Sequence, residues 1–117
     1  RIMPVGYSEL FLEKGASFNT TLTLDDVNGN TFDLTGYTAN SEIRKSYYSA
    51  NAVATFTTSF SETPTDGNLT LSLSYQQTAN IAPGRYVYDV YLTDETETNR
   101  VRVLEGIINV TPSATHL

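Results

Sequence analysis

The chain has 117 residues, enough for one domain, and its lack of cysteine excludes disulfides, thiolate metal sites and cysteine nucleophiles. Its 7 Lys and Arg against 13 Asp and Glu give a formal net charge of -6. Nucleic acid is therefore not expected as a partner, because binding a phosphate backbone requires clustered basic side chains. No apolar run reaches the roughly 20 residues of a membrane helix, and no signal-peptide pattern is present, so neither a membrane partner nor secretory export is expected.

Residues 1–7 have no strand periodicity, and Pro4 and Gly6 would interrupt a strand. We interpret this segment as an N-terminal arm, which either is a disordered end or contacts a neighbouring subunit. The residues predicted to make such contacts are the apolar ones: Ile2, Met3, Val5 and Tyr7.

Two short strands are predicted after the arm. Residues 9–13 form the first strand, which stops at Lys14-Gly15. Residues 17–24 form the second, because large side chains alternate there with threonine and asparagine, as on a strand with one solvated face.

Acidic and amide side chains gather between residues 25 and 33 and could supply oxygen ligands to calcium. However, Asn30 is followed by Thr31 instead of the glycine of a helix-loop-helix calcium site, and no acidic residue closes the loop. The pair Asn28-Gly29 is the strongest short signal for a hairpin turn. A plain turn is therefore favoured, and no metal or other cofactor is predicted.

The middle of the chain alternates strands with turns. Residues 37–43 predict a strand, and the polar, aromatic residues 46–51 predict a loop because they have no apolar face. Tyr47 and Tyr48 on this loop are predicted partner contacts, since aromatic side chains are enriched at interfaces. Residues 52–60 predict one further strand, and residues 69–74 another.

Residues 76–80 are the one plausible helical turn, predicted to cross between two sheets. Pro83-Gly84 then predicts a tight turn that begins a strand whose every second residue, from Tyr86 to Leu92, is large and apolar or aromatic. In immunoglobulin-like sandwiches, a tyrosine at this place bonds through its hydroxyl to the preceding backbone, and Tyr86 is well placed to do so.

The last predicted strand covers residues 100–110 and follows an acidic hairpin tip at residues 94–99. Its pattern changes phase around Gly106, where Ile107 and Ile108 are adjacent, and this indicates a β-bulge. The residues predicted to be buried between two sheets are Phe18, Leu22, Leu71, Leu73, Tyr86, Tyr88, Val90, Val101 and Val103.

Many short strands without a long helix predict an all-β fold, an immunoglobulin-like antiparallel β-sandwich of seven or eight strands. A closed barrel is the alternative. The sandwich should span residues 8–112, between the arm at 1–7 and a C-terminal tail at 113–117.

Catalytic chemistry is not predicted. The single histidine, His116, is expected to be solvated in the tail, so no histidine-based triad or metal cluster is expected. Glu95 and Glu97 lie in an acidic tip where solvation accounts for them, so they do not indicate a general acid. The glycosylation triplets that begin at Asn19, Asn68 and Asn109 are attributed to chance.

Several strand and turn segments together resemble a known family. They are residues 33–38, 42–45, 67–73, 83–90 and 102–112. The segments are similar to small structural domains of tailed phages, among them the immunoglobulin-like N-terminal domain of the phage baseplate upper protein. The resemblance covers about residues 17 to 112 and is carried by folding signals, without any transferable functional residue.

This resemblance implies a non-enzymatic virion protein, assembled in the host cytoplasm through contacts at the tail, baseplate, neck or fibre junction. The implied partners are other virion proteins, in homo-oligomeric or multi-copy arrangement, and no small-molecule ligand is expected. A capsid decoration or host-surface adhesion module is the alternative. A hydrolytic enzyme ranks last, because its acid and base are not found in the sequence.

Overall fold

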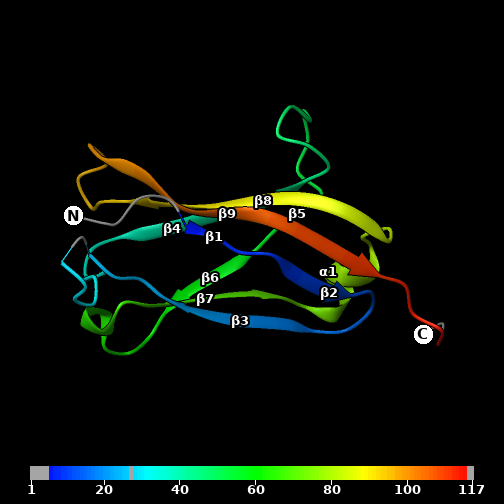
Figure 1. Ribbon diagram of the computed structural model, residues 1–117, viewed down its shortest axis with the longest axis horizontal. Helices are drawn as coiled ribbons and strands as arrows, with labels where there is room; N and C mark the ends of the chain where they lie inside the picture. The colour runs from blue at the N-terminus through cyan, green and yellow to red at the C-terminus, as the bar shows by residue number, and fades with distance from the viewer. Residues whose placement is uncertain (1–5, 27, 116–117) are drawn as a thin grey trace.

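The computed structural model describes residues 6–26 and 28–115, whose strands form two sheets packed face to face (Figure 1). The large sheet has the order β1-β9-β8-β4-β5, with β2 also paired with β9, and the small sheet has the order β3-β7-β6. The predicted all-β sandwich is confirmed. The strands are β1 (Gly6–Tyr7), β2 (Leu10–Glu13), β3 (Phe18–Thr23), β4 (Thr38–Arg44), β5 (Ala54–Thr55), β6 (Thr57–Phe60), β7 (Asn68–Leu73), β8 (Gly84–Thr93) and β9 (Arg100–Thr111).

The core lies between the sheets, where alternate residues of β7 and β8 face each other. Leu71 and Val90 are completely buried, and Tyr88 is 1% exposed. Two predicted core residues, Phe18 and Leu22, are half-buried and pack against the core. The prediction for Val101 is wrong, since 42% of it is exposed. The other predicted core residues are buried: Leu73, Tyr86 and Val103.

The turn before β8 has the predicted tyrosine geometry. The hydroxyl of Tyr86 donates a hydrogen bond of 2.6 Å to the carbonyl oxygen of Ala82, four residues earlier. The short helix α1 (Tyr75–Ala79) precedes this turn and connects β7 of the small sheet with β8 of the large sheet. Its first turn is held by a reciprocal capping box between Ser74 and Gln77. The predicted crossing between the sheets is therefore confirmed.

The N-terminal strands depart from the antiparallel pattern. Both β1 and β2 pair in parallel with β9 at one constant register, from Gly6 opposite Leu104 to Glu13 opposite Thr111. Gly6 and Tyr7, predicted to belong to an arm without strand structure, are thus an edge strand of the chain's own sheet. A first strand beside the last one needs no hairpin connection, so local turn signals do not reveal this pairing.

Gly106 allows this close approach. A Cβ atom added at Gly106 would overlap the carbonyl oxygen of Ser8, so any larger residue would push the N-terminal strand outward. The same carbonyl accepts a hydrogen bond of 2.8 Å from the hydroxyl of Tyr88. Burial raises the pKa of Tyr88 to about 12. The core tyrosine thus fixes the N-terminal strand to the large sheet.

The β-bulge was predicted at the wrong residue. Gly106 pairs regularly with Tyr88, and the register between β8 and β9 shifts where Val90 lies opposite Leu104 and Tyr91 lies opposite Arg102. Val103 is the additional residue, and both Val103 and Leu104 are buried. Beyond the bulge, Val101 lies opposite the buried Leu92 and shares its face, but 42% of Val101 is exposed near the start of β9.

The predicted strand over residues 52–60 divides at Phe56. Its first part, β5, pairs with β4 in the large sheet, whereas β6 pairs with β7 in the small sheet. Phe56 is buried at the crossing, and its amide donates a hydrogen bond of 2.9 Å to the carbonyl oxygen of Ser41. Alternation continues through the crossing, so the sequence pattern does not distinguish one strand from two.

The turn at Asn28-Gly29 exists but does not join two paired strands. Gly29 has a φ of +83°, and Asp25 forms an isolated antiparallel bridge with Thr31. The strand before the turn, β3, pairs with β7, and the next strand, β4, lies in the other sheet. The turn therefore begins a crossing between sheets that includes buried Phe32 and Leu34.

Candidate functional site

The face of the large sheet that points away from the small sheet is the candidate site. We call it the outer face. Side chains of the large sheet alternate between the core and this face, and the N-terminal strand extends it along β9. Its residues include Tyr7, Glu9, Phe11 and Glu13 of β1, β2 and their junction, Arg85, Val87 and Asp89 of β8, Arg102, Glu105, Ile107 and Asn109 of β9, and Glu42 and Arg44 of β4.

Three carboxylates form a row across the middle of the outer face. Glu105 lies opposite Asp89 in the β-ladder, and Asp89 lies opposite Glu42. Side chains in such positions lie about 5 Å apart, so three negative charges without partners would repel one another. Two arginines offset that repulsion, because Arg102 lies 3.8 Å from Asp89 and 3.5 Å from Glu105, and Arg44 lies 2.7 Å from Glu42.

Asp89 is the central carboxylate of the row, and its environment shifts its titration. Partial burial raises the pKa of Asp89, Arg102 opposes this shift, and the neighbouring Glu105 and Glu42 raise the pKa further. The row is thus a cluster of three carboxylates offset by two arginines, and partial burial makes the negative charge of Asp89 less favourable than in water.

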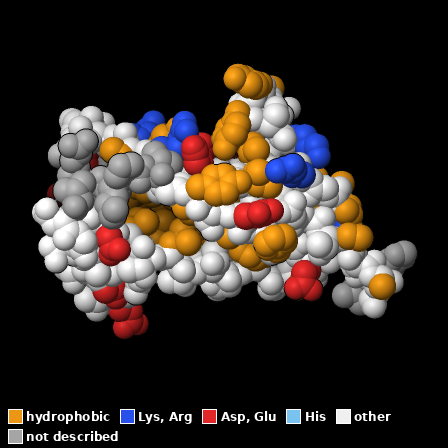
Figure 2. Space-filling model, viewed as in Figure 1, with side chains coloured by type: hydrophobic (Ala, Val, Ile, Leu, Met, Phe, Trp, Pro, Cys, Tyr) orange, Lys and Arg blue, Asp and Glu red, His pale blue; other side chains and the backbone are white. Residues whose placement is uncertain are grey.

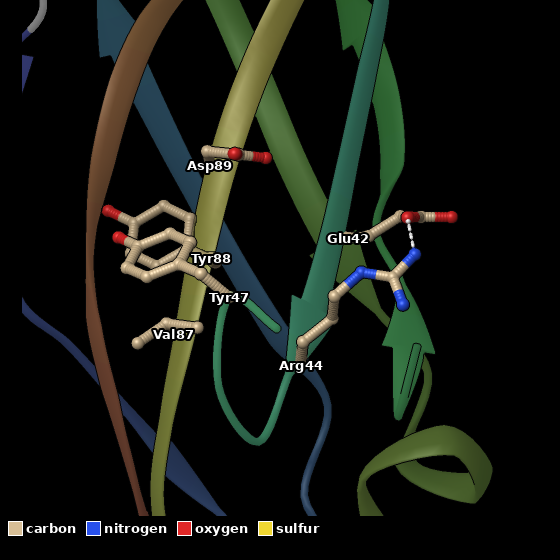
Figure 3. A pocket seen from close by; sticks show the side chains of 6 residues that line it. All are labelled: Glu42, Arg44, Tyr47, Val87, Tyr88 and Asp89. Atoms are coloured by element: carbon tan, nitrogen blue, oxygen red, sulfur yellow. Dashed lines mark hydrogen bonds and ion pairs between the residues drawn. The ribbon is translucent and has the colours of Figure 1, made fainter. Parts of the chain in front are cut away.

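Tyr47 covers part of this row. The loop 46–51 rises above the large sheet (Figure 1). It is closed by two hydrogen bonds of 3.1 Å, in which the amide of Ser46 donates to the hydroxyl of Ser49 and the amide of Ser49 donates to the carbonyl oxygen of Ser46. Arg44 also donates to the carbonyl oxygen of Ser49 at 3.1 Å. As a result, Tyr47 lies in front of β8 near Asp89 (Figure 3). Burial and the nearby negative charges of Glu105 and Asp89 raise the pKa of Tyr47.

A cavity of about 90 Å³ lies under Tyr47. It is lined by Glu42, Arg44, Val87, Tyr88 and Asp89 in addition to Tyr47 (Figure 3). Sites for small molecules and cofactors usually have volumes of about 300–1,000 Å³, so this cavity suits a few water molecules and not a cofactor. Its surroundings of paired charges and two tyrosine side chains are typical of a protein contact surface.

The structure brings some of the predicted contact residues together. Tyr7 and Tyr47 both lie on the outer face, where 65% and 52% of these residues are exposed, and Tyr48 is 98% exposed on the same loop. Ile2, Met3 and Val5 lie outside the described residues. Sequence reasoning missed Phe11, which is 64% exposed. Its position between the inward-facing Leu10 and Leu12 was the available signal.

A larger cleft lies at the end of the sandwich near the C-terminal tail. Its volume is about 680 Å³, and its lining includes Lys14, Tyr75, Gln76, Pro83 and Pro112. Lys14 is held there because its ammonium group donates to the carbonyl oxygens of Ala79 and Ile81. The cleft is lined by α1, by the turns after β2 and before β8, and by the residues that follow β9.

Two carboxylates within residues 25–33 stabilise backbone turns by accepting hydrogen bonds. Asp26 accepts hydrogen bonds from the amides of Asn28 and Asn30, and Asp33 accepts from the amide and hydroxyl of Thr35. Within residues 6–26 and 28–115, no group of three histidine, cysteine, aspartate or glutamate residues has the geometry of a metal site. In the same part of the chain, no helix is long and apolar enough to cross a membrane.

A family of β-sandwich domains matches nearly the whole chain. The family is described as LtfC-like, beta-sandwich domain, and its model matches residues 4–111. The chain belongs to the LtfC-like family. No curated protein sequence matches it. Membership in the family agrees with the two-sheet architecture.

Two solved structures have folds similar to this chain. CopC from Methylosinus trichosporium OB3b is 16% identical with a TM-score of 0.50, and the match covers 92% of this chain and 90% of that chain. InlP from Listeria monocytogenes is 13% identical with a TM-score of 0.50, and the match covers 91% of this chain and 27% of that chain. At these identities, the likeness concerns the fold alone.

Proposed function

We propose that this LtfC-like domain is a non-enzymatic structural protein of a tailed-phage virion, assembled through protein contacts at the tail, baseplate, neck or fibre junction. The proposal begins from the resemblance of residues 17 to 112 to small tailed-phage structural domains. Its expected location is the virion, after assembly in the host cytoplasm. Its expected partners are other virion proteins, in several copies.

The observation that carries the proposal is the composition of the outer face. Exposed Tyr7, Phe11, Tyr47 and Tyr48 accompany arginines that are already oriented by ion pairs. Aromatic residues and arginine are enriched at protein interfaces and dominate their binding energy. A face of this kind, on a sandwich whose core is filled by its own side chains, favours assembly through protein contacts.

Incorporation into particles tests this proposal. The double variant Tyr47→Ala, Tyr48→Ala should be incorporated several-fold less than the unchanged chain, because it removes the aromatic contacts of loop 46–51 but no buried side chain. Tyr75→Ala is the matched control, since Tyr75 is 55% exposed on α1, outside loop 46–51. Full incorporation of the double variant, with a density map that leaves the outer face uncovered, would refute a contact role for this face.

A second candidate function, host-surface adhesion, is favoured by the cleft at the end of the sandwich. Tyr75 offers an exposed ring there, next to the amides of Gln76 and Asn80 and the apolar surfaces of Pro83 and Pro112. Stacking on an aromatic ring together with amide hydrogen bonds suits a sugar. Loss of adsorption by Tyr75→Ala particles with normal incorporation would support this function.

A further inference from the structure

Charges on the outer face are separated between two strands. Glu9 and Glu13 lie on either side of the exposed Phe11 at the β2 edge, whereas the exposed Arg85 lies near the start of β8. Lys45 does not belong to this face, because its ammonium group donates to the carbonyl oxygen of Arg85 at 3.0 Å and lies 4.7 Å from the ring centre of the buried Tyr86. None of the three ion pairs found among the described residues includes Glu9, Glu13 or Arg85, and the side-chain amide of Asn109 donates a hydrogen bond to the Glu9 carboxylate.

The β-ladder fixes the distance between the two groups. Phe11 lies opposite Asn109 of β9, and Asn109 lies opposite Arg85 of β8. The acidic and basic groups are therefore two strand spacings apart, about 10 Å, with β9 between them. Ile107 and Val87, which are half-buried and lie opposite each other, form an apolar strip beside this line. In Figure 2, viewed as Figure 1, Lys and Arg side chains lie near acidic and hydrophobic side chains in the upper part of the molecule, where the large sheet is.

We infer that the outer face binds the outer face of a second copy of this chain around a two-fold axis that runs along β9. This inference rests on the proposed function, for which it names a partner. A rotation about that axis turns the face over and places β2 of one copy on β8 of the other. Glu9 and Glu13 then meet Arg85, and the same contact forms twice, as in any isologous dimer.

The same rotation gives a role to the projecting loop. The loop 46–51 follows β4, which lies beyond β8 in the sheet, so it comes to lie just outside the β2 edge of the second copy. Phe11 and Tyr7 are exposed along that edge. Tyr47 and Tyr48 therefore meet aromatic side chains of the partner, and these contacts supply the apolar part of the interface while the charges set its orientation.

Exchanging the charges tests this arrangement. In sedimentation experiments, the unchanged chain should form a dimer, and Glu13→Lys or Arg85→Glu should each raise its Kd about tenfold or more, because each change alters both symmetric contacts. An equal mixture of the two variants should restore the dimer, since the introduced lysine of one copy then faces the introduced glutamate of the other, and the native pair remains on the other side. Glu62→Lys, an exposed change of the same charge outside this face, should have no effect.

Each other outcome overturns the inference. A chain that stays monomeric at its highest soluble concentration, a dimer that tolerates both reversals, or a mixture that remains monomeric while both variants keep native circular dichroism would exclude this dimer. The failure of the inference is distinguishable from that of the proposed function. A monomeric chain that is still incorporated into particles leaves the virion role intact, whereas a dimeric chain that is never incorporated removes it.

Discussion

The two sheets of the sandwich have similar inner faces and very different outer faces. Towards the core, both sheets present buried leucine, valine, isoleucine or tyrosine. Away from the core, the large sheet presents aromatic side chains, carboxylates and arginines, whereas the small sheet presents only uncharged polar side chains. These are Asn19, Thr21 and Thr23 of β3, Thr57 and Ser59 of β6, and Asn68, Thr70 and Ser72 of β7.

This difference separates the requirements of folding from those of binding. Burying an apolar inner face stabilises a sandwich whichever sheet supplies it, and threonine is a good strand former that satisfies its hydroxyl on a solvated face. For folding, the outer side of the small sheet therefore needs only uncharged polar side chains. Charged and aromatic residues on the large sheet contribute little to folding in comparison, and they are the residues expected to bind a partner.

The largest expected effect is on the inner side that both sheets share. Tyr88→Ala removes a ring that packs edge-on against Phe56 at 6.2 Å between centroids, and should lower the free energy of unfolding by roughly 3–5 kcal/mol. Denaturant unfolding measures this change. Tyr48→Ala is the control, because that residue is 98% exposed and its loss should leave the free energy unchanged. Equal effects of the two variants would contradict the described core.

The next effect concerns the strand that completes the outer face. Gly106→Ala places a methyl group against the Ser8 carbonyl and the Tyr88 ring, and should cost about 1–3 kcal/mol of stability through overpacking. Hydrogen exchange at residues 10–13 should become faster, because β2 pairs with β9 alone. Gly6→Ala is a milder control, since its new Cβ would lie 3.4 Å from a flexible leucine side chain. Unchanged exchange in the Gly106 variant would show that the strand is not held there.

Much of this architecture could be predicted from local sequence patterns. The alternation from Tyr86 to Leu92 identified a central strand, and the hydroxyl contact of Tyr86 with Ala82 is as predicted. These successes share one cause, since each depends on residues within a few positions of one another. Period-two alternation and turn chemistry are local properties that a sequence displays directly.

The unpredicted features depend on contacts between distant segments. The parallel pairing of β2 with β9 joins residues nearly one hundred positions apart, and the change of sheet at Phe56 leaves the alternation intact. The bulge was misplaced because two adjacent isoleucines indicated Gly106, although Val103 is the additional residue. For the candidate site, two loop tyrosines were found by composition, but the ladder that aligns Glu42, Asp89 and Glu105 exists only once the strands are paired.

A smaller effect is expected at the charged centre of the outer face. Burial raises the folded-state pKa of Asp89, so folding favours its protonated form, and this contribution is lost as pH rises above the carboxyl's ordinary value of 3.8. Asp89→Asn should therefore stabilise the fold at neutral pH, by about 1 kcal/mol or less after solvent screening, and the gain should disappear in acid. Unfolding measured over a range of pH tests the sign.

Asp33 supplies the opposite case. Hydrogen bonds from the hydroxyl and amide of Thr35 lower the pKa of Asp33 below 3.8, so its contribution to stability is present above that pH and is lost as pH falls through the lowered value. Asp33→Asn should therefore weaken the fold at neutral pH and lose its effect in strong acid. If both substitutions changed stability in the same direction at neutral pH, the proposed causes of the two shifts would be wrong.

The smallest effect lies on the uncharged face and tests the comparison most directly. The hydroxyls of Thr21 and Thr70 lie 2.9 Å apart across the ladder, and a double-mutant cycle with valine at both positions should give a coupling of about 0.2–0.5 kcal/mol. This coupling should not change with salt, because neither side chain is charged. The matching cycle for Arg102 and Glu105, at 3.5 Å on the outer face, should weaken as salt screens the pair. A salt-dependent threonine coupling, or a salt-independent ion pair, would mean that the two faces do not differ electrostatically in the way their compositions indicate.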